Sequence, residues 1–213
     1  MDVQNEEMVE TRLAGDETTL RIYADLMDEV RERVAVINSI TENKMAWANQ
    51  FVEEVLYLQV RLLCEQVAIG CLIAHGDVPT RKIMKSYEPS KIMAAMEELN
   101  PNFFPKPVKL IFSPGRLHLD EYDGPSITQS ELVQVWNQCG AKVHKGSALK
   151  IRKNHGRQSG GDFQKTLDTA QKIIGLLQSH RISSSQNSQH LIAVLADTSN
   201  AGRANVWFAE APE

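Results

Sequence analysis

The sequence contains few cysteines, which limits the redox chemistry open to it. Only three occur in 213 residues, Cys64, Cys71 and Cys139, and their spacing matches no disulfide framework. Cys64 and Cys71 are seven residues apart in an apolar helical stretch, about 10 Å along the helix axis, which is too far for a disulfide bond. We therefore expect reduced thiols in a protein core and a cytoplasmic location. The N-terminal residues also lack the pattern of a secretory signal.

The sequence also lacks the motifs that identify a metal site, a nucleotide site or a catalytic nucleophile. Its six histidines are scattered and belong to no zinc-binding motif: His75, His118, His144, His155, His180 and His190. No Gly-rich phosphate loop and no Gly-x-Ser-x-Gly turn occurs. We therefore expect no metal ion and no cofactor, and the sequence leaves open whether the protein is an enzyme.

Acidic residues are missing from one stretch of an otherwise acidic chain. The formal net charge is −4, yet no Asp or Glu occurs between Glu131 and Asp162. That stretch contains six cations and two histidines: Lys142, Lys145, Lys150, Arg152, Lys153, Arg157, His144 and His155. A basic, Gly/Ser-containing segment suits phosphate groups, because contacts to phosphate are mainly electrostatic. The segment 142–157, which we call the basic segment, therefore predicts binding of RNA, DNA or a phosphorylated ligand.

Two other interpretations of the basic segment remain open. It is either an ordinary solvated loop or a loop that docks on the protein's own acidic N-terminal helix. Through residue 30 the chain has nine acidic residues against two arginines, which gives such docking an electrostatic basis. No aromatic residue of the Phe, Tyr or Trp type interrupts the segment, so a base-stacking platform is not expected there.

Hydrophobic periodicity predicts a mainly helical chain. Helices are expected over residues 17–40, 46–75, 89–99, 128–143 and 163–177. The first carries an apolar stripe that begins at Ile22 and recurs every three or four residues. Thr128 and Glu131 have the spacing of a capping box, and Gly76 suits a left-handed helix end. The second helix is apolar nearly all round, so neighbouring elements must cover it on most sides.

Residues 55–74 of that central helix could be mistaken for a membrane span. They include Arg61 and Glu65, and two full charges near the middle of a bilayer would be costly. We therefore interpret the stretch as a buried helix of a soluble protein and expect no membrane partner.

Two pairs of β-rich runs complete the secondary structure. Residues 108–112 and 116–120 flank Ser113-Pro114-Gly115, and residues 190–196 and 203–209 flank a second turn. The two hairpins can combine into one small antiparallel sheet, because an isolated hairpin is marginal in water. The predicted fold class is therefore mainly α (α+β): a helical bundle around a long buried central helix, with a small antiparallel β appendage.

The same patterns predict one domain with a short tail. Residues 1–16 are polar and acidic and are expected to be disordered or frayed. Residues 17–213 are expected to form a single helical domain, with β-hairpins near 107–121 and 190–210.

Arg61 and Glu65 are the most unusual residues of the central helix. They are four residues apart, on one face of an element that is otherwise apolar. Burying either charge alone is expensive, so we expect them to pair with each other or with a third polar group. The pair is either an internal ion pair that locks the bundle or the lining of a polar hole that binds a ligand.

His144, His155 and Arg152 are the candidates for catalysis. His144 follows the predicted helix 128–143, where the helix dipole favours a histidine and where it could also act as a general base. Cys139 and His144 are five residues apart, so on a helix they point in different directions and do not form a nucleophile–base pair.

This layout resembles the HEPN proteins, which are helical bundles common in toxin–antitoxin and phage-defence systems. The resemblance rests on the long apolar helix with Arg61 and Glu65, the later helix that ends at His144, and the basic segment. It implies an RNA-cleaving enzyme that acts as a homodimer through an arginine and a histidine separated by four to six residues. The positions before His144 at that separation hold Cys139, Gln138 and Asn137, so the motif itself is not matched.

Two functions are therefore carried forward. The first is a binding or regulatory protein that engages nucleic acid or a phosphorylated ligand through the basic segment. The second is an enzyme of the toxin or defence type that cleaves RNA with His144 or His155 and a nearby arginine.

Overall fold

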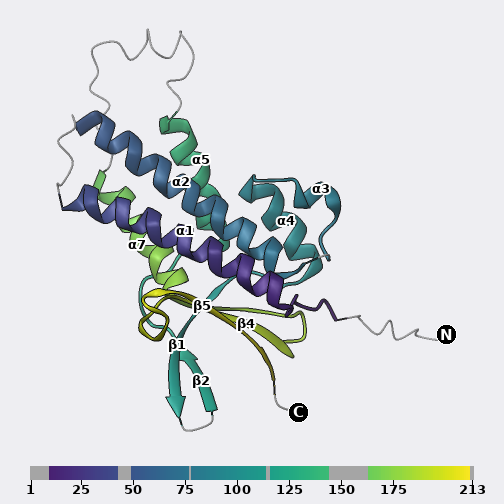
Figure 1. Ribbon diagram of the computed structural model, residues 1–213. Coiled ribbons are helices and arrows are strands. Elements are labelled where there is room, and N and C mark those ends of the chain that lie inside the picture. Colours follow the sequence, from purple (N-terminus) through teal and green to yellow (C-terminus); the bar gives the residue numbers. More distant parts are fainter. Residues whose placement is uncertain (1–9, 43–48, 77, 114–115, 144–162, 212–213) are drawn as a thin grey trace.

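The computed structural model describes residues 10–42, 49–76, 78–113, 116–143 and 163–211, and it has two layers (Figure 1). One layer consists of helices packed around a long central helix. The other is a five-stranded antiparallel sheet that lies beneath them in Figure 1. The predicted fold class, mainly α with a small antiparallel sheet, is confirmed.

The five predicted helices begin and end close to the predicted positions, and the described residues contain one further, four-residue helix, Arg81–Met84, that was not predicted. The helices are α1 (Glu17–Thr41), α2 (Asn49–Ala74), α3 (Arg81–Met84), α4 (Pro89–Leu99), α5 (Gln129–Val143) and α7 (Phe163–Gln178). The capping box before α5 is formed: the Thr128 N–H donates to Glu131 Oε2 at 2.9 Å, and the Glu131 N–H donates to Thr128 Oγ1 at 3.3 Å. Gly76 has a φ of +53°, which confirms the left-handed end of α2.

The sheet contains both predicted hairpins and one strand that the pattern does not predict. Its strands are β1 (Lys106–Ser113), β2 (Arg116–Glu121), β3 (Ser179–Ser183), β4 (Gln189–Asp197) and β5 (Arg203–Glu210). Their order is β2-β1-β3-β4-β5, so β3 lies between the two hairpins and joins them. The β1–β2 hairpin projects away from the helices at the bottom of Figure 1.

β3 was missed because it follows α7 with no loop between them. The last helical residue is Gln178 and the first strand residue is Ser179, so no Gly or Pro marks the change. Only His180 and Ile182 within it are turned toward the helices and fully buried, which is too short an alternation to stand out in the sequence.

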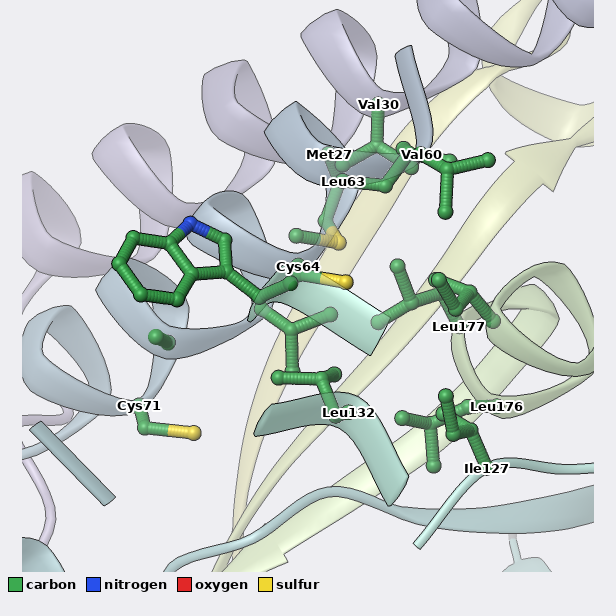
Figure 2. Close-up of a cluster of buried hydrophobic side chains, with 14 of the residues drawn as sticks. Met27, Val30, Val60, Leu63, Cys64, Cys71, Ile127, Leu132, Leu176 and Leu177 are labelled. Atoms are coloured by element: carbon green, nitrogen blue, oxygen red, sulfur yellow. The ribbon is translucent and has the colours of Figure 1, made fainter. Parts of the chain in front are cut away.

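The core is built around α2, as the sequence predicts. Val60, Leu63 and Cys64 of α2 are fully buried and belong to one apolar cluster with residues of α1, α5 and α7. Figure 2 shows the labelled members of this cluster: Met27, Val30, Val60, Leu63, Cys64, Cys71, Ile127, Leu132, Leu176 and Leu177. By length and composition Phe51–Ala74 could cross a membrane, but 61% of its most apolar window is buried within the protein. Such burial is typical of the core helix of a soluble protein.

Two details of the N-terminal region correct the sequence analysis. Residues 1–9 lie outside the described residues, but residues 10–16 are held in place rather than frayed. The Thr11 N–H donates to Ser185 Oγ at 2.9 Å, and the Ala14 N–H donates to the Ala74 carbonyl at 2.9 Å. In α1, Ile22 is 48% exposed, whereas Tyr23 is buried, because the stripe facing the core is shifted by one position there.

Candidate functional site

Arg61 and Glu65 form the ion pair that their spacing predicts. Arg61 Nε lies 3.3 Å from Glu65 Oε1, and the two side chains are only 20% and 16% exposed. The pair therefore sits at the edge of the core rather than on the free surface of α2. At this depth a charge without a partner would be costly, so each side chain depends on the other.

Trp136 of α5 is the third member of this site. Its indole N–H donates to Glu65 Oε1 at 2.8 Å, and Arg61 Nη1 donates to the Trp136 carbonyl oxygen at 3.2 Å. The guanidinium carbon of Arg61 also lies 4.1 Å from the centroid of the Trp136 ring, within the range of a cation–π contact. Arg61, Glu65 and Trp136 thus form a closed triad across the α2–α5 interface.

The sequence analysis missed Trp136, although one signal pointed to it. Trp136 is 9% exposed on a helix with an apolar face, and a buried indole N–H needs an acceptor. The sequence does not show which group accepts from the indole N–H, because the acceptor, Glu65, is 71 residues away along the chain.

Gly140 makes room for the triad. A Cβ atom built on Gly140 would lie 2.2 Å from Arg61 Nη1, so no other residue fits while the guanidinium stays in place. A glycine in mid-helix costs helix stability, and at this position it allows the close approach of the Arg61 side chain.

The basic segment begins on α5 at Lys142, which follows Trp136 of the triad along the same helix. Near the end of α5, Lys142 Nζ lies 6.0 Å from the centroid of the Tyr57 ring of α2. Lys142 is exposed near the end of α5. The other predicted binding or catalytic residues lie outside the described residues: His144, Lys145, Lys150, Arg152, Lys153, His155 and Arg157.

The thiols near this site are protonated at neutral pH. Burial raises the pKa of Cys139 to about 11, although the Arg61 guanidinium acts in the opposite direction. Burial also raises the pKa of Cys64 well above its usual range. A thiol is a nucleophile only as the thiolate, so neither cysteine is activated here. All three cysteines are free, as the sequence predicts.

A second group of buried polar side chains connects α2, α4 and β3. The Asn100 side-chain N–H₂ donates to His75 Nε2 at 2.8 Å and to the Ser183 carbonyl oxygen at 2.8 Å. His75 Nδ1 lies 2.7 Å from the Cys71 carbonyl oxygen, which fits the neutral tautomer with its proton on Nδ1. Burial lowers the pKa of His75, in agreement with a neutral ring.

His180 is held in the same way by α1 and α7. Its Nε2 lies 2.7 Å from the Tyr23 hydroxyl, and its Nδ1 lies 3.1 Å from the Leu177 carbonyl oxygen. Burial lowers the pKa of His180 to about 4. Both His75 and His180 thus satisfy all of their ring nitrogens within the fold, and they have no position left for a ligand.

The described residues contain no group of three or more His, Cys, Asp or Glu side chains that could hold a metal ion.

The acidic face of α1 is already partly neutralised by arginines of the same chain. Asp28 Oδ2 lies 2.8 Å from Arg203 Nη2, and Glu29 is paired with Arg33. These pairs reduce the charge that α1 offers to the basic segment.

Comparison with protein-family models, with curated proteins and with solved structures finds no match for this chain. The resemblance to HEPN bundles therefore stays a prediction from layout.

Proposed function

We propose that the protein is a cytoplasmic binding protein that engages nucleic acid through the basic segment. The observation that carries this proposal is the charge pattern: six cations and no acidic residue occur between Glu131 and Asp162 in a chain of net charge −4. Such a run attracts the phosphate backbone and displaces its counterions. Three free cysteines support the cytoplasmic location.

The position of Lys142 supports the proposal. Lys142 is the first cation of the basic segment, and it is exposed on a helix that the Arg61–Glu65–Trp136 triad fastens to α2. The pairing of Asp28 and Glu29 with arginines disfavours the alternative in which the basic segment neutralises α1.

The test is a salt series with a charge-neutralised variant. Lys150, Arg152 and Lys153 are replaced together by Gln, and binding of a fluorescein-labelled 20-nucleotide RNA and of a 20-base-pair DNA is followed by anisotropy. We expect weaker binding and a slope of log K against log salt that is lower by about 2 to 3, because up to three phosphate contacts are lost.

The control variant carries the same change of net charge at another place. Arg81, Lys82 and Lys85 are exposed residues in or next to α3, and their replacement by Gln removes three charges outside the basic segment. An equal loss of binding in both triple variants, or no loss in either, would contradict the proposal. Binding of inorganic phosphate at low millimolar concentration, measured by calorimetry, with no binding of either nucleic acid, would point to a phosphorylated small ligand.

RNA cleavage is the second candidate, because the basic segment also contains His144, His155 and Arg152. In this case the wild type cuts the labelled RNA, and either His144→Ala or His155→Ala abolishes the cut while binding is kept. Sedimentation would then show a homodimer, as the HEPN layout implies. If the wild type binds the RNA but does not cut it, cleavage is excluded and only the binding function remains.

A further inference from the structure

A cleft of about 550 Å³ opens in the sheet at the start of β3. Its walls come from β1, β3, β4 and β5, from Tyr122 after β2, and from the end of α7. The volume is typical of sites that bind a ligand. This cleft takes no part in the α2–α5 triad, and none of its lining residues belongs to the basic segment.

The cleft exists because one strand position of the sheet is only partly filled. β3 pairs with β1 at just two positions, Lys106 with Arg181 and Pro107 with His180. Its pairing with β4 begins at Ser179 opposite Val194. Before Ser179 the chain belongs to α7 and has left the sheet, whereas β1 runs on to Ser113 and β4 to Asp197. The position between β1 and β4 is therefore vacant beyond the start of β3.

At its start, next to Ser179, the vacant position is one strand wide, and its two sides carry the backbone hydrogen-bonding groups of β1 and β4. β1 and β4 each lie one strand spacing, about 4.8 Å, from β3, so where β3 begins the space between them admits one strand. In an antiparallel strand every second residue turns its N–H and C=O to a given side. Beyond Pro107 on β1 and beyond Val194 on β4, the described part of the sheet provides no strand partner on the side that faces β3.

The side chains around this position are mostly apolar. His180 turns toward α1, where it bonds Tyr23, so residues that alternate with it turn to the opposite, open face of the sheet. By the register, that open face carries Val108 and Leu110 of β1 and Val194 and Trp207 of the second hairpin. All four line the cleft.

The charged side chains that line the cleft already have partners within the fold. Lys109 is neutralised by Asp123, with Nζ 2.8 Å from Oδ1. The carboxylate of Asp197 accepts from the Ser199 N–H and from the Asn205 side chain, at 2.8 and 2.9 Å. In contrast, Ser179 Oγ is buried and has no hydrogen-bond partner within the described residues. It stands at the point where a guest backbone would meet β3.

We propose that this cleft binds a short, extended, uncharged peptide as an added strand between β1 and β4. The guest backbone pairs with the open edges of β1 and β4, which provides affinity independent of sequence. One of its apolar side chains packs against Trp207, Leu110 and Val108, which provides specificity. This site is independent of the proposed nucleic-acid function and of the basic segment.

The experiment uses the full chain and a phage library of random heptapeptides. The library is panned on the wild type after depletion on the Leu110→Ala/Trp207→Ala variant, and the enriched sequence is synthesised with blocked ends. We expect enrichment of peptides with alternating apolar residues, and NMR shift changes at residues 108–111, at 194–197 and at the Trp207 indole. Leu110→Ala is expected to lower the affinity for the synthetic peptide at least tenfold.

Two matched controls make the test specific. Ile111→Ala changes the neighbouring residue of β1, which is 45% exposed and does not line the cleft, and it is expected to leave affinity unchanged. An N-methylated form of the same peptide keeps the side chains but loses backbone donors, and it should not bind. Equal binding of the N-methylated peptide would show an ordinary apolar pocket, and no enrichment over the depleted library would show no peptide site. Either result would overturn the proposal.

Discussion

At the scale of single residues, Arg61 illustrates how a charge is kept at the edge of an apolar core. Its guanidinium has three partners: a carboxylate, a carbonyl oxygen and the face of an indole ring. Glu65 in turn accepts from both Arg61 and Trp136. Charge-assisted hydrogen bonds of this kind are stronger than neutral ones, so their loss leaves the remaining members with unsatisfied groups.

Arg61→Leu should therefore lower the free energy of unfolding by about 2 kcal/mol, because it strands the carboxylate of Glu65. Urea denaturation at pH 7 measures the change. The double variant Arg61→Leu/Glu65→Leu should be less destabilised than the sum of the two single variants, because the stranded carboxylate is then gone. Strict additivity, or an unchanged midpoint for Arg61→Leu, would show that the triad contributes little.

At the scale of elements, the approach of α2 to α5 is set by a glycine. Alanine has a higher helix propensity than glycine by about 1 kcal/mol, so Gly140→Ala would stabilise an isolated α5. In the folded protein the added methyl group collides with Arg61 Nη1, which is fixed by the triad.

Gly140→Ala should thus destabilise the wild type, and the sign should reverse in the Arg61→Leu background, where the collision is removed. The four proteins form a double-mutant cycle that thermal denaturation can measure. A stabilising effect of Gly140→Ala in both backgrounds would mean that the guanidinium moves aside at little cost.

Asn100 joins α4 to the end of α2 and to β3 through buried hydrogen bonds. It ends α4 and donates both side-chain protons, one to His75 at the end of α2 and one to the carbonyl of Ser183 in β3. The sheet is therefore joined to the helices by buried hydrogen bonds as well as by apolar packing. Such bonds require particular atoms at particular positions, which gives the interface a defined arrangement.

At the scale of the whole molecule, two buried neutral histidines make stability depend on pH. The folded pKa of His180 is about 4, below its usual value of 6.5, and that of His75 is also lowered. Between these values the unfolded chain binds protons that the folded protein does not. The free energy of unfolding is therefore highest above pH 6.5 and falls as the pH drops toward 4.

His180 alone should account for a loss of about 3 kcal/mol in unfolding free energy between pH 6.5 and pH 4. Urea denaturation at half-unit pH intervals measures the slope. His180→Asn, which cannot be protonated in this range, should show a smaller slope than the wild type. Identical slopes in the two proteins would place the pH dependence on other groups, such as carboxylates.

The sequence by itself determined the elements whose signals are local. The helix ends at Thr128 and Gly76, the two hairpins and the pairing of Arg61 with Glu65 all follow from residues a few positions apart. The same holds for the charge of the basic segment, which is a property of composition. Local spacing fixes these features because backbone geometry relates near neighbours directly.

Only the tertiary structure decided which distant residues meet. Trp136 with Glu65, Asn100 with His75 and Ser183, and Tyr23 with His180 are contacts across 25 to 157 residues. The vacant position beside β3 also depends on where the chain of α7 leaves the sheet, which no single segment encodes. These features arise from packing of whole elements, where burial must be satisfied for all of them at once.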